Sequence, residues 1–234
     1  MKYFLLLFLS TMLSAQSFEP IINNYTKLDY SGESPIWDID YNGNNGEIYF
    51  ANNRNILVYD GNFWMKLSNN NLAIVRSIFS KKGLVYSGSL NEFGYYDIKT
   101  RKYTSLSKQF KIFKNLEQEE IWKIFEFKNK IYFQSFNNLY VYDGKQVKKQ
   151  SLPSLSSYIF QVDDKLLVAT ISKGIFEIES DHFKPLFQVQ SNIPTVVHGI
   201  ISVDNHYLIG TLKDGLFWVN KSNPSWCLGS RYFL

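Results

Sequence analysis

The sequence predicts an all-β fold built from five copies of one antiparallel hairpin. Two runs carry this prediction: residues 48–61 read IYFANNRNILVYDG and residues 131–144 read IYFQSFNNLYVYDG. Each run is an apolar strand, a polar break, a second apolar strand and an Asp-Gly turn. Related runs are VYSGSLNEFGYYD from Val85, LLVATISKGIFEI from Leu166 and YLIGTLKDGLFWV from Tyr207. An aromatic content of 17%, with 16 Tyr and 19 Phe, also favours sheet.

The spacing of the copies predicts the architecture. The second strands begin at Ile48, Val85, Ile131, Leu166 and Tyr207, so the intervals are 37, 46, 35 and 41 residues. A period near 40 residues with several short strands per unit is typical of a propeller blade, whereas helical repeats would show a 3.6-residue period. We therefore predict an all-β β-propeller of four-stranded antiparallel blades, with about five repeats present.

The other two strands of each blade are predicted on either side of the hairpin. An isoleucine in a short apolar run marks the innermost strand of each copy: Ile39, Ile78, Ile124, Ile159 and Ile200. The fourth strands are less regular, and their candidate segments are residues 63–67, 102–106, 146–151 and 183–187. A single blade buries little surface, so stacked neighbours must supply the core.

The same pattern sets the domain boundaries. Residues 35–220 hold the propeller repeats, and the charged insertion at 106–120 predicts a surface loop or a short helical turn. Residues 221–234 form an atypical tail that interrupts the fifth blade before its last strand, which indicates an altered carboxy terminus or a gene fragment. The repeat count fits a closed five-bladed ring, with residues 25–30 as a strand that completes the last sheet, or an open arc of a larger propeller. We favour the incomplete propeller.

The first residues predict export. Residues 1–15, MKYFLLLFLSTMLSA, combine one Lys, an apolar stretch and small residues ahead of Gln16, which is the layout of a secretory signal peptide. The apolar part has about 11 residues, fewer than the roughly 20 that a membrane span needs. An uncleaved anchor or a buried strand is the alternative. We expect an exported, periplasmic protein with an N-terminal segment at 16–34 and no transmembrane segment.

Composition narrows the class of partner. The formal charge of +4 is scattered in pairs such as Lys148 and Lys149, so no basic stripe predicts nucleic-acid binding. Cys227 is the single cysteine, which excludes an internal disulfide framework.

No motif predicts an enzyme, a metal site or a cofactor. The run DIDYNG at 38–43 opens like a calcium loop, but Tyr49 stands where the acidic ligand at the twelfth position belongs, so a strand and turn is the better interpretation. The three histidines lack metal spacing, and no Ser nucleophile elbow is present. The acidic pair Glu119 and Glu120 is expected to face solvent. A glycosidase assembled from carboxylates of different blades stays an alternative.

Register singles out one ring of positions for ligand binding. Two residues before the innermost-strand isoleucines stand Trp37, Arg76, Trp122, Ser157 and His198. Equivalent positions in a propeller form a ring around the central channel. Trp37, Arg76, Trp122 and His198 could stack on a sugar ring and hydrogen-bond its hydroxyls or a carboxylate. The alternative is that these side chains fill the core between blades.

Longer strings resemble a known family. The runs GEIYFANNRNILVYDGNFW at 46–64, SGSLNEFGYYD at 87–97, IWKIFEFKNKIYFQSFNNLYVYDG at 121–144 and YLIGTLKDGLFWVN from Tyr207 resemble the N-terminal propeller of bacterial two-component-regulator propeller proteins. The resemblance spans roughly residues 20–220 and is strongest to LuxR-type regulators with an exported propeller. It implies a periplasmic sensor, and carbohydrate fragments are ligands for some members.

The chain also departs from that family. The family's immunoglobulin-like domain, transmembrane helix and cytoplasmic kinase or helix-turn-helix output domain have no counterpart in these 234 residues. Copies one and three replace the family's apolar-Gly-Thr strand by Ala51-Asn52 and Gln134-Ser135.

We therefore predict a non-enzymatic module, the ligand-sensing propeller portion of a bacterial signal-transduction receptor or transcriptional regulator. Its ligand would be a carbohydrate or another small molecule. Three alternatives stay open: a propeller enzyme that acts on polysaccharide, a protein-interaction scaffold and a non-functional fragment. Carboxylates that converge on the channel mouth would indicate the enzyme, and a channel filled by side chains would indicate the scaffold.

Overall fold

A computed structural model describes residues 20, 22–43, 45–68, 74–114, 118–180, 182–187, 196–213, 215–222 and 226–227. It contains five four-stranded antiparallel sheets, each with its strands in sequence order. These sheets confirm the predicted all-β class and the four-stranded blades. The predicted signal peptide at 1–15 lies outside the described residues.

The five blades, numbered in chain order, contain the following strands. Blade 1 is β1 (Asp38–Asn42), β2 (Glu47–Ala51), β3 (Asn55–Tyr59) and β4 (Trp64–Ser68). Blade 2 is β5 (Ser77–Lys81), β6 (Leu84–Ser89), β7 (Glu92–Asp97) and β8 (Lys102–Ser105). Blade 3 is β9 (Lys123–Phe127), β10 (Lys130–Gln134), β11 (Asn138–Tyr142) and β12 (Val147–Ser151). Blade 4 is β13 (Ser156–Val162), β14 (Lys165–Thr170), β15 (Gly174–Glu179) and β16 (His182–Phe187), and blade 5 is β17 (Val197–Val203), β18 (His206–Thr211), β19 (Leu216–Asn220) and β20 (Trp226–Cys227).

The hairpins form where the alternation of apolar and polar residues and the turn residues predict them. Each second strand begins one residue earlier than predicted, as with β2 at Glu47 and β10 at Lys130. The Asp-Gly turns are present: Gly61 has φ +97°, a left-handed conformation that glycine adopts at little cost. The carboxylate of Asp60 accepts hydrogen bonds from the backbone N–H groups of Asn62 and Phe63, at 2.8 and 2.7 Å. Short-range sequence signals therefore determine the hairpins.

Apolar side chains between neighbouring sheets form the core. Between blades 1 and 2, Tyr49 and Val58 pack with Val75, Ile78 and Val85, and all five are at most 3% exposed. Burying one such aliphatic side chain contributes roughly 1.5–3 kcal/mol. Similar clusters fill the other three interfaces. The blades thus hold together through stacking, as expected for repeats that bury little alone.

Polar side chains of the innermost strand β1 also form hydrogen bonds to the next blade. The Asp38 carboxylate accepts a hydrogen bond from the backbone N–H of Ile78 at 3.0 Å, and Asp40 accepts one from the N–H of Ser80 at 2.6 Å. The run that opens like a calcium loop is therefore strand β1 followed by a turn, as predicted. Its two carboxylates hold β5 of the next blade.

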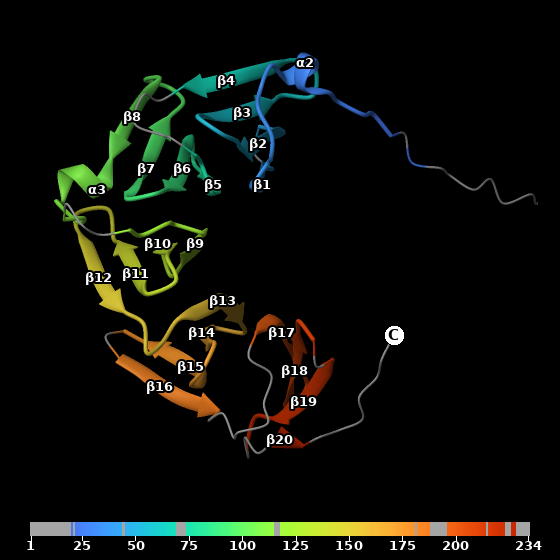
Figure 1. Cartoon of the computed structure of the whole chain (residues 1–234), viewed down its shortest axis with the longest axis vertical. Coiled ribbons are helices and arrows are strands. Elements are labelled where there is room, and N and C mark those ends of the chain that lie inside the picture. The colour runs from blue at the N-terminus through green and yellow to red at the C-terminus, as the bar shows by residue number, and fades with distance from the viewer. Residues whose placement is uncertain are drawn as a thin grey trace, which may run out of the picture.

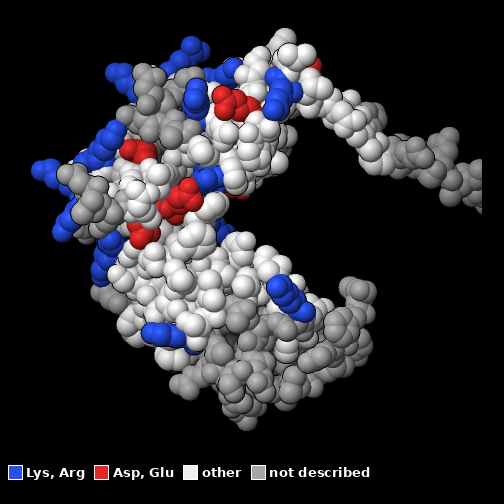
Figure 2. Space-filling view, viewed as in Figure 1, with Lys and Arg blue, Asp and Glu red and all other residues white. Residues whose placement is uncertain are grey.

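The five blades form an open arc (Figure 1), with blades 1 and 5 at its two ends. The innermost-strand isoleucines Ile78, Ile124, Ile159 and Ile200 are 1–5% exposed, whereas Ile39 in blade 1 is 59% exposed. This difference arises because, in the part of the chain that the structure describes, blade 1 packs on blade 2 through its opposite face and no blade covers Ile39. Figure 2 shows the hollow of the arc, with Lys and Arg side chains mainly around the outer rim of the first blades. The incomplete propeller predicted from the repeat count is confirmed.

The structure differs from the sequence interpretation at both ends. The closed-ring alternative required residues 25–30 to form a strand, but Lys27–Tyr30 forms the short helix α2, which contacts β4 of blade 1. The tail at 221–234 was expected to hold no strand, yet β20 pairs with β19 through Trp226 opposite Val219 and Cys227 opposite Trp218. Tyr25 and Tyr30 instead pack on Trp64, with ring centroids 5.4 and 5.5 Å apart, and such aromatic contacts hold the N-terminal segment on blade 1.

The insertion at 106–120 contains the short helix α3 (Leu106–Gln109). The hydroxyl of Ser105 caps it by accepting a hydrogen bond from the backbone N–H of Lys108 at 3.1 Å. Leu106 is 1% exposed and joins the core between blades 2 and 3. The segment is therefore a helical turn with a buried side rather than a purely exposed loop.

Candidate functional site

Three of the predicted ring residues occupy equivalent backbone positions in blades 1, 2 and 3. Trp37, Arg76 and Trp122 each stand immediately before the innermost strand, and their backbone N–H groups bond to the second strand of their own blade. The N–O distances are 2.9 Å from Trp37 to Ala51, 2.8 Å from Arg76 to Gly88 and 2.8 Å from Trp122 to Gln134. The repeat thus brings one residue from each of three blades to the same end of the innermost strands.

The side chains of these three residues contact one another. The guanidinium carbon of Arg76 lies 3.7 Å from the ring centroid of Trp37 and 5.1 Å from that of Trp122. The two indole rings are 6.4 Å apart with an interplanar angle of 71°. Each cation–π contact contributes about 0.5–2 kcal/mol, with the larger values at desolvated sites. We call these three residues the Trp–Arg cluster.

Glu120 completes the charge balance of the Trp–Arg cluster. One carboxylate oxygen of Glu120 accepts hydrogen bonds from Nη2 and Nε of Arg76, at 3.1 and 3.3 Å. The two side chains are only 13% and 29% exposed. Glu120 reaches this position because it forms an isolated bridge with Leu90 beside the β6–β7 turn. The expectation that Glu119 and Glu120 face solvent is therefore wrong; Glu119 accepts a hydrogen bond from the amide of Asn138 at 2.9 Å.

The Trp–Arg cluster holds hydrogen-bond donors without acceptors. Nη1 of Arg76 and Nε1 of Trp122 are buried and have no hydrogen-bond partner among the described residues. An unsatisfied buried donor costs about 1–3 kcal/mol, and such groups are often completed by water or a ligand. By contrast, Nε1 of Trp37 donates to the Asn53 side chain at 3.0 Å.

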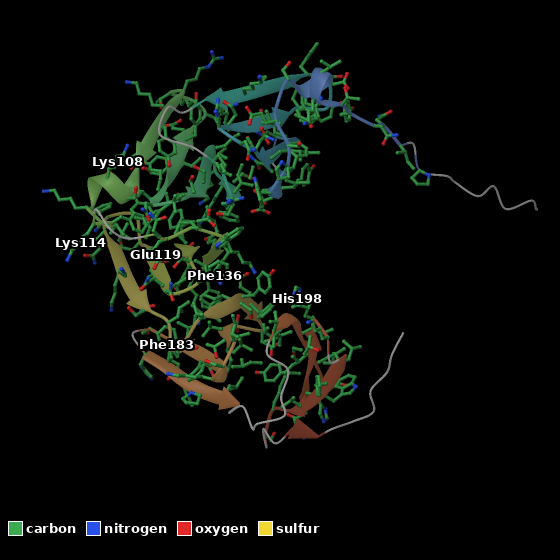
Figure 3. All side chains as sticks on the ribbon, viewed as in Figure 1. Lys108, Lys114, Glu119, Phe136, Phe183 and His198 are labelled. Atoms are coloured by element: carbon green, nitrogen blue, oxygen red, sulfur yellow. The ribbon has the colours of Figure 1, made fainter. Side chains whose placement is uncertain are left out.

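An aromatic surface continues from the Trp–Arg cluster. Phe136, in the turn between β10 and β11, lies 5.4 Å from Trp122 between ring centroids. Trp37 is 39% exposed and Phe136 is 44% exposed, so aromatic surface is available to solvent on both sides of Trp122. In Figure 3, Phe136 lies on the side of blade 3 that faces the hollow of the arc. Sequence analysis missed Phe136 and Glu120 because neither stands at the repeated register.

The other two ring positions do not join the Trp–Arg cluster. The pairing of β13 with β14 shifts between Ser156 and Tyr158, and that of β17 with β18 shifts between Val197 and Gly199. These bulges redirect the inserted residues. The Ser157 hydroxyl consequently donates to the carbonyl of Ala169 at 3.1 Å. His198 packs against Tyr158 with ring centroids 5.4 Å apart, so the structure places it in a separate pair.

Charged groups of the innermost strands lie next to these positions. Burial raises the pKa of Asp38, although hydrogen bonds from the backbone of Ile78 and Ile39 oppose this effect. Burial lowers the pKa of Lys123, and the negative charge of Asp38 opposes that shift. Lys123 also donates to the carbonyl of Ile159 at 2.8 Å, which joins blade 3 to blade 4. The side chains of Asp38 and Lys123 therefore each form a hydrogen bond to the neighbouring blade.

Two hollows lie elsewhere on the molecule. One of about 480 Å³ lies between blades 3 and 4, and its lining includes the ion pair of Lys165 and Glu177 at 2.8 Å. One of about 370 Å³ lies under the N-terminal segment against Phe50 and Trp64. Neither includes a predicted ring residue, so we place the candidate site at the Trp–Arg cluster on chemical grounds.

Neither a cluster of metal ligands nor a membrane-spanning helix occurs among the described residues. Among these residues, no group of three or more His, Cys, Asp or Glu side chains could hold a metal ion. None of the described helices is long and apolar enough to cross a membrane.

Comparison with solved structures confirms the propeller fold. The WD40 β-propeller domain of Doa1 matches with a TM-score of 0.62 and 10% identity, over 83% of this chain and 68% of that one. The computationally designed protein Ika8 matches with a TM-score of 0.61 and 13% identity, over 82% of this chain and 60% of that one. At these identities the similarity shows the fold alone.

A third similar structure is an extracellular domain. It belongs to BT4673 from B. thetaiotaomicron, which is described as a hybrid two component system in one structure and a one component system in another. The TM-scores are 0.60 and 0.59 at 19% and 17% identity, over 81% and 87% of this chain. This chain spans only 27% and 30% of those chains. No family model and no curated protein matches the sequence.

Proposed function

We propose that this chain is the ligand-sensing propeller portion of an exported bacterial signal-transduction receptor or regulator, acting as a binding module without catalysis. The observation that carries the proposal is the convergence of Trp37, Arg76 and Trp122 from three blades, with two buried donors unpartnered among the described residues. Similarity to the extracellular domain of BT4673 supports the sensing role and the exported location.

The chemistry of the Trp–Arg cluster favours a small ring-shaped ligand. Exposed indole and phenyl faces stack on the apolar face of a sugar or another flat ring. The buried N–H groups of Arg76 and Trp122 that lack a partner among the described residues can donate to hydroxyl or carboxylate oxygens of a ligand. Glu120 is already engaged by Arg76, so the cluster offers binding contacts rather than a free general acid or base. A carbohydrate fragment offers both an apolar ring face for stacking and oxygens that accept hydrogen bonds.

Binding is tested by titrating neutral and uronic-acid oligosaccharides into the protein, with intrinsic Trp fluorescence and calorimetry as readouts. Trp37→Ala is the primary variant because Trp37 is 39% exposed and available for stacking, so its loss should weaken binding at least about tenfold. Its melting temperature should fall only modestly, through the lost contacts with Arg76 and Asn53. His198→Ala is the matched control, because His198 holds the same repeat position but lies in a different pair.

Two results would contradict the proposed function. One is the absence of any saccharide that binds the wild-type protein. The other is a large fall in the melting temperature of Trp37→Ala with unchanged ligand affinity, which would assign the Trp–Arg cluster to packing between blades. Equal weakening of binding in His198→Ala would move the site toward blade 5.

A further inference from the structure

A hollow of about 370 Å³ lies between the N-terminal segment and one face of blade 1. Its floor is made by alternate residues of the sheet, because successive side chains along a strand point to opposite faces. Strand pairing places Phe50 beside Leu57 and Tyr59 beside Trp64 on the side of the hollow. Val58 points to the other side and belongs to the core shared with blade 2. The floor is therefore the face of blade 1 that does not pack on blade 2.

The N-terminal segment supplies the roof of this hollow. The carboxylate of Asp29 closes the α2 turn by accepting hydrogen bonds from the backbone N–H and the hydroxyl of Thr26, at 2.6 and 2.7 Å. Tyr25 precedes this turn and Tyr30 ends it, and the rings of both pack on Trp64. In Figure 1, α2 accordingly lies against β4 at the blade 1 end of the arc.

Further hydrogen bonds fix the roof of the hollow over its floor. The hydroxyls of Tyr25 and Tyr59 bond to each other at 2.6 Å, and the Tyr59 hydroxyl donates to the carbonyl of Gly61 at 2.8 Å. The backbone N–H of Glu33 donates to the side chain of Asn52, a fully buried residue, at 3.1 Å. Both walls of the hollow are thus held in place by the protein itself, as in most sites for small molecules.

Aromatic rings dominate the lining of the hollow, and none of its described lining residues carries a charge. The rings are those of Tyr25, Tyr30, Phe50, Tyr59 and Trp64. Phe50 and Tyr59 lie 5.2 and 4.8 Å from Trp64 between ring centroids. Such a lining offers no ionic partner to an anion. It also offers too few hydrogen-bond partners to a sugar, whose hydroxyls would lose water without replacement.

One polar group of this lining lacks a partner. Nε1 of Trp64 is buried and has no hydrogen-bond partner among the described residues. The hydroxyls of Tyr25 and Tyr59, by contrast, bond to each other. A buried donor without an acceptor is uncommon in folded proteins, and an acceptor from water or from a ligand usually accounts for it. The described lining thus combines apolar surface with a buried N–H donor that needs an acceptor.

We propose that this hollow is a second binding site, which takes a small uncharged compound with an apolar ring and an acceptor oxygen, such as an aromatic ketone. The ring packs on the aromatic side chains of the lining, and the oxygen accepts a hydrogen bond from Nε1 of Trp64. The volume of about 370 Å³ is within the range of small-molecule pockets, about 300–1,000 Å³. The hollow shares no residue with the Trp–Arg cluster, so each site can fail its test without the other.

Acetophenone and ethylbenzene are the matched probes, because they share a phenyl ring and only acetophenone has an acceptor oxygen. Saturation-transfer NMR and calorimetry measure the binding of each probe to the full chain. Acetophenone should bind about fivefold more tightly than ethylbenzene, which is the range expected for one hydrogen bond. Trp64→Phe keeps an aromatic ring but removes the N–H group. It should therefore abolish that difference by weakening the binding of acetophenone alone.

Two further variants locate the probes. Ile48 lines the hollow, so the larger side chain of Ile48→Phe should occupy part of it and weaken the binding of both probes at least about tenfold. Trp218→Phe is the matched control for Trp64→Phe, because Trp218 is a partly exposed indole in blade 5, and it should leave the binding of both probes unchanged. Melting curves establish that all three variants are folded.

Several results would overturn the second binding site. If neither probe binds the wild-type chain, or if folded Ile48→Phe binds both probes as wild type does, the hollow is not a site for such compounds. If Trp64→Phe weakens both probes equally, or Trp218→Phe does the same, the N–H group of Trp64 does not select an acceptor. Tighter binding of tetramethylammonium than of acetophenone would assign the aromatic rings to a cation instead.

Discussion

At the residue scale, Glu92 is the most buried acidic residue of the described blades. It is 4% exposed, beneath α3, and the Tyr103 hydroxyl donates to its carboxylate at 3.2 Å. Lys108 lies 3.9 Å away but is itself 62% exposed. Burial raises the pKa of Glu92, and hydrogen bonds from Ser105 with the charge of Lys108 only partly offset this effect.

A pH-dependent stability follows for Glu92→Gln. Because the pKa of Glu92 is higher in the folded than in the unfolded protein, the ionised form costs stability, and this cost appears as pH rises through the folded-state pKa. Glutamine keeps an acceptor for Tyr103 and never ionises. The variant should therefore gain stability relative to wild type as pH rises from about 4 to neutral.

Urea denaturation of both proteins across that pH range measures the difference. Glu33→Gln serves as the control because Glu33 is solvent-exposed. A difference in unfolding free energy between Glu92→Gln and wild type that does not vary with pH would show that Glu92 carries no such cost.

At the element scale, close packing inside a sheet explains one glycine of the second repeat. Gly94 lies in β7 opposite Ser105 of β8. A Cβ atom on Gly94 would stand 2.1 Å from the carbonyl oxygen of Thr104 and 2.9 Å from the Tyr103 hydroxyl. Because the first neighbour is backbone, the sheet would have to separate locally.

Gly94→Ala should accordingly destabilise the protein by about 1–3 kcal/mol through overpacking. Gly199→Ala is the matched control, since Gly199 also lies in a strand, β17, and nothing lies within 4 Å of an added Cβ. Equilibrium unfolding in urea would compare the two variants. Equal effects at both positions would contradict the packing argument and indicate a general cost of replacing glycine in these strands.

At the scale of the whole molecule, the blades of the open arc differ in whether one or both of their faces pack against another blade. Blade 3 packs on both faces, against blade 2 through the cluster around Phe93 and Phe133 and against blade 4 through the cluster around Leu139 and Leu166. Among the described residues, the core contacts of blade 5 are with blade 4, and its other face exposes Ile201. In a stacked array each interface adds to stability, so the end blade should open first.

Hydrogen exchange measured by mass spectrometry tests this gradient. Backbone amides of β18 and β19 should exchange at least about tenfold faster than those of β10 and β11, which occupy equivalent places in blade 3. Uniform protection across all five blades would mean that the arc unfolds as one unit. It would also mean that the exposed face of the end blade does not lower the local stability of that blade.

The sequence by itself determined the repeated hairpins, the Asp-Gly turns and the four-stranded blades. These features depend on the local alternation of apolar and polar residues and on turn residues, and the five copies repeat this pattern. It also placed Trp37, Arg76 and Trp122 at one register, and in the structure these three side chains contact one another.

Only the tertiary structure decided the rest of the candidate site. Glu120 joins Arg76 from an insertion 44 residues away, and Phe136 arrives through a turn outside the repeat register. Bulges in β13 and β17 remove Ser157 and His198 from the Trp–Arg cluster. The packing of α2 on blade 1 and the exposure of one face of blade 5 likewise depend on which surfaces contact another element. Contacts between distant segments carry no local signal, because they arise from the packing of one blade on the next.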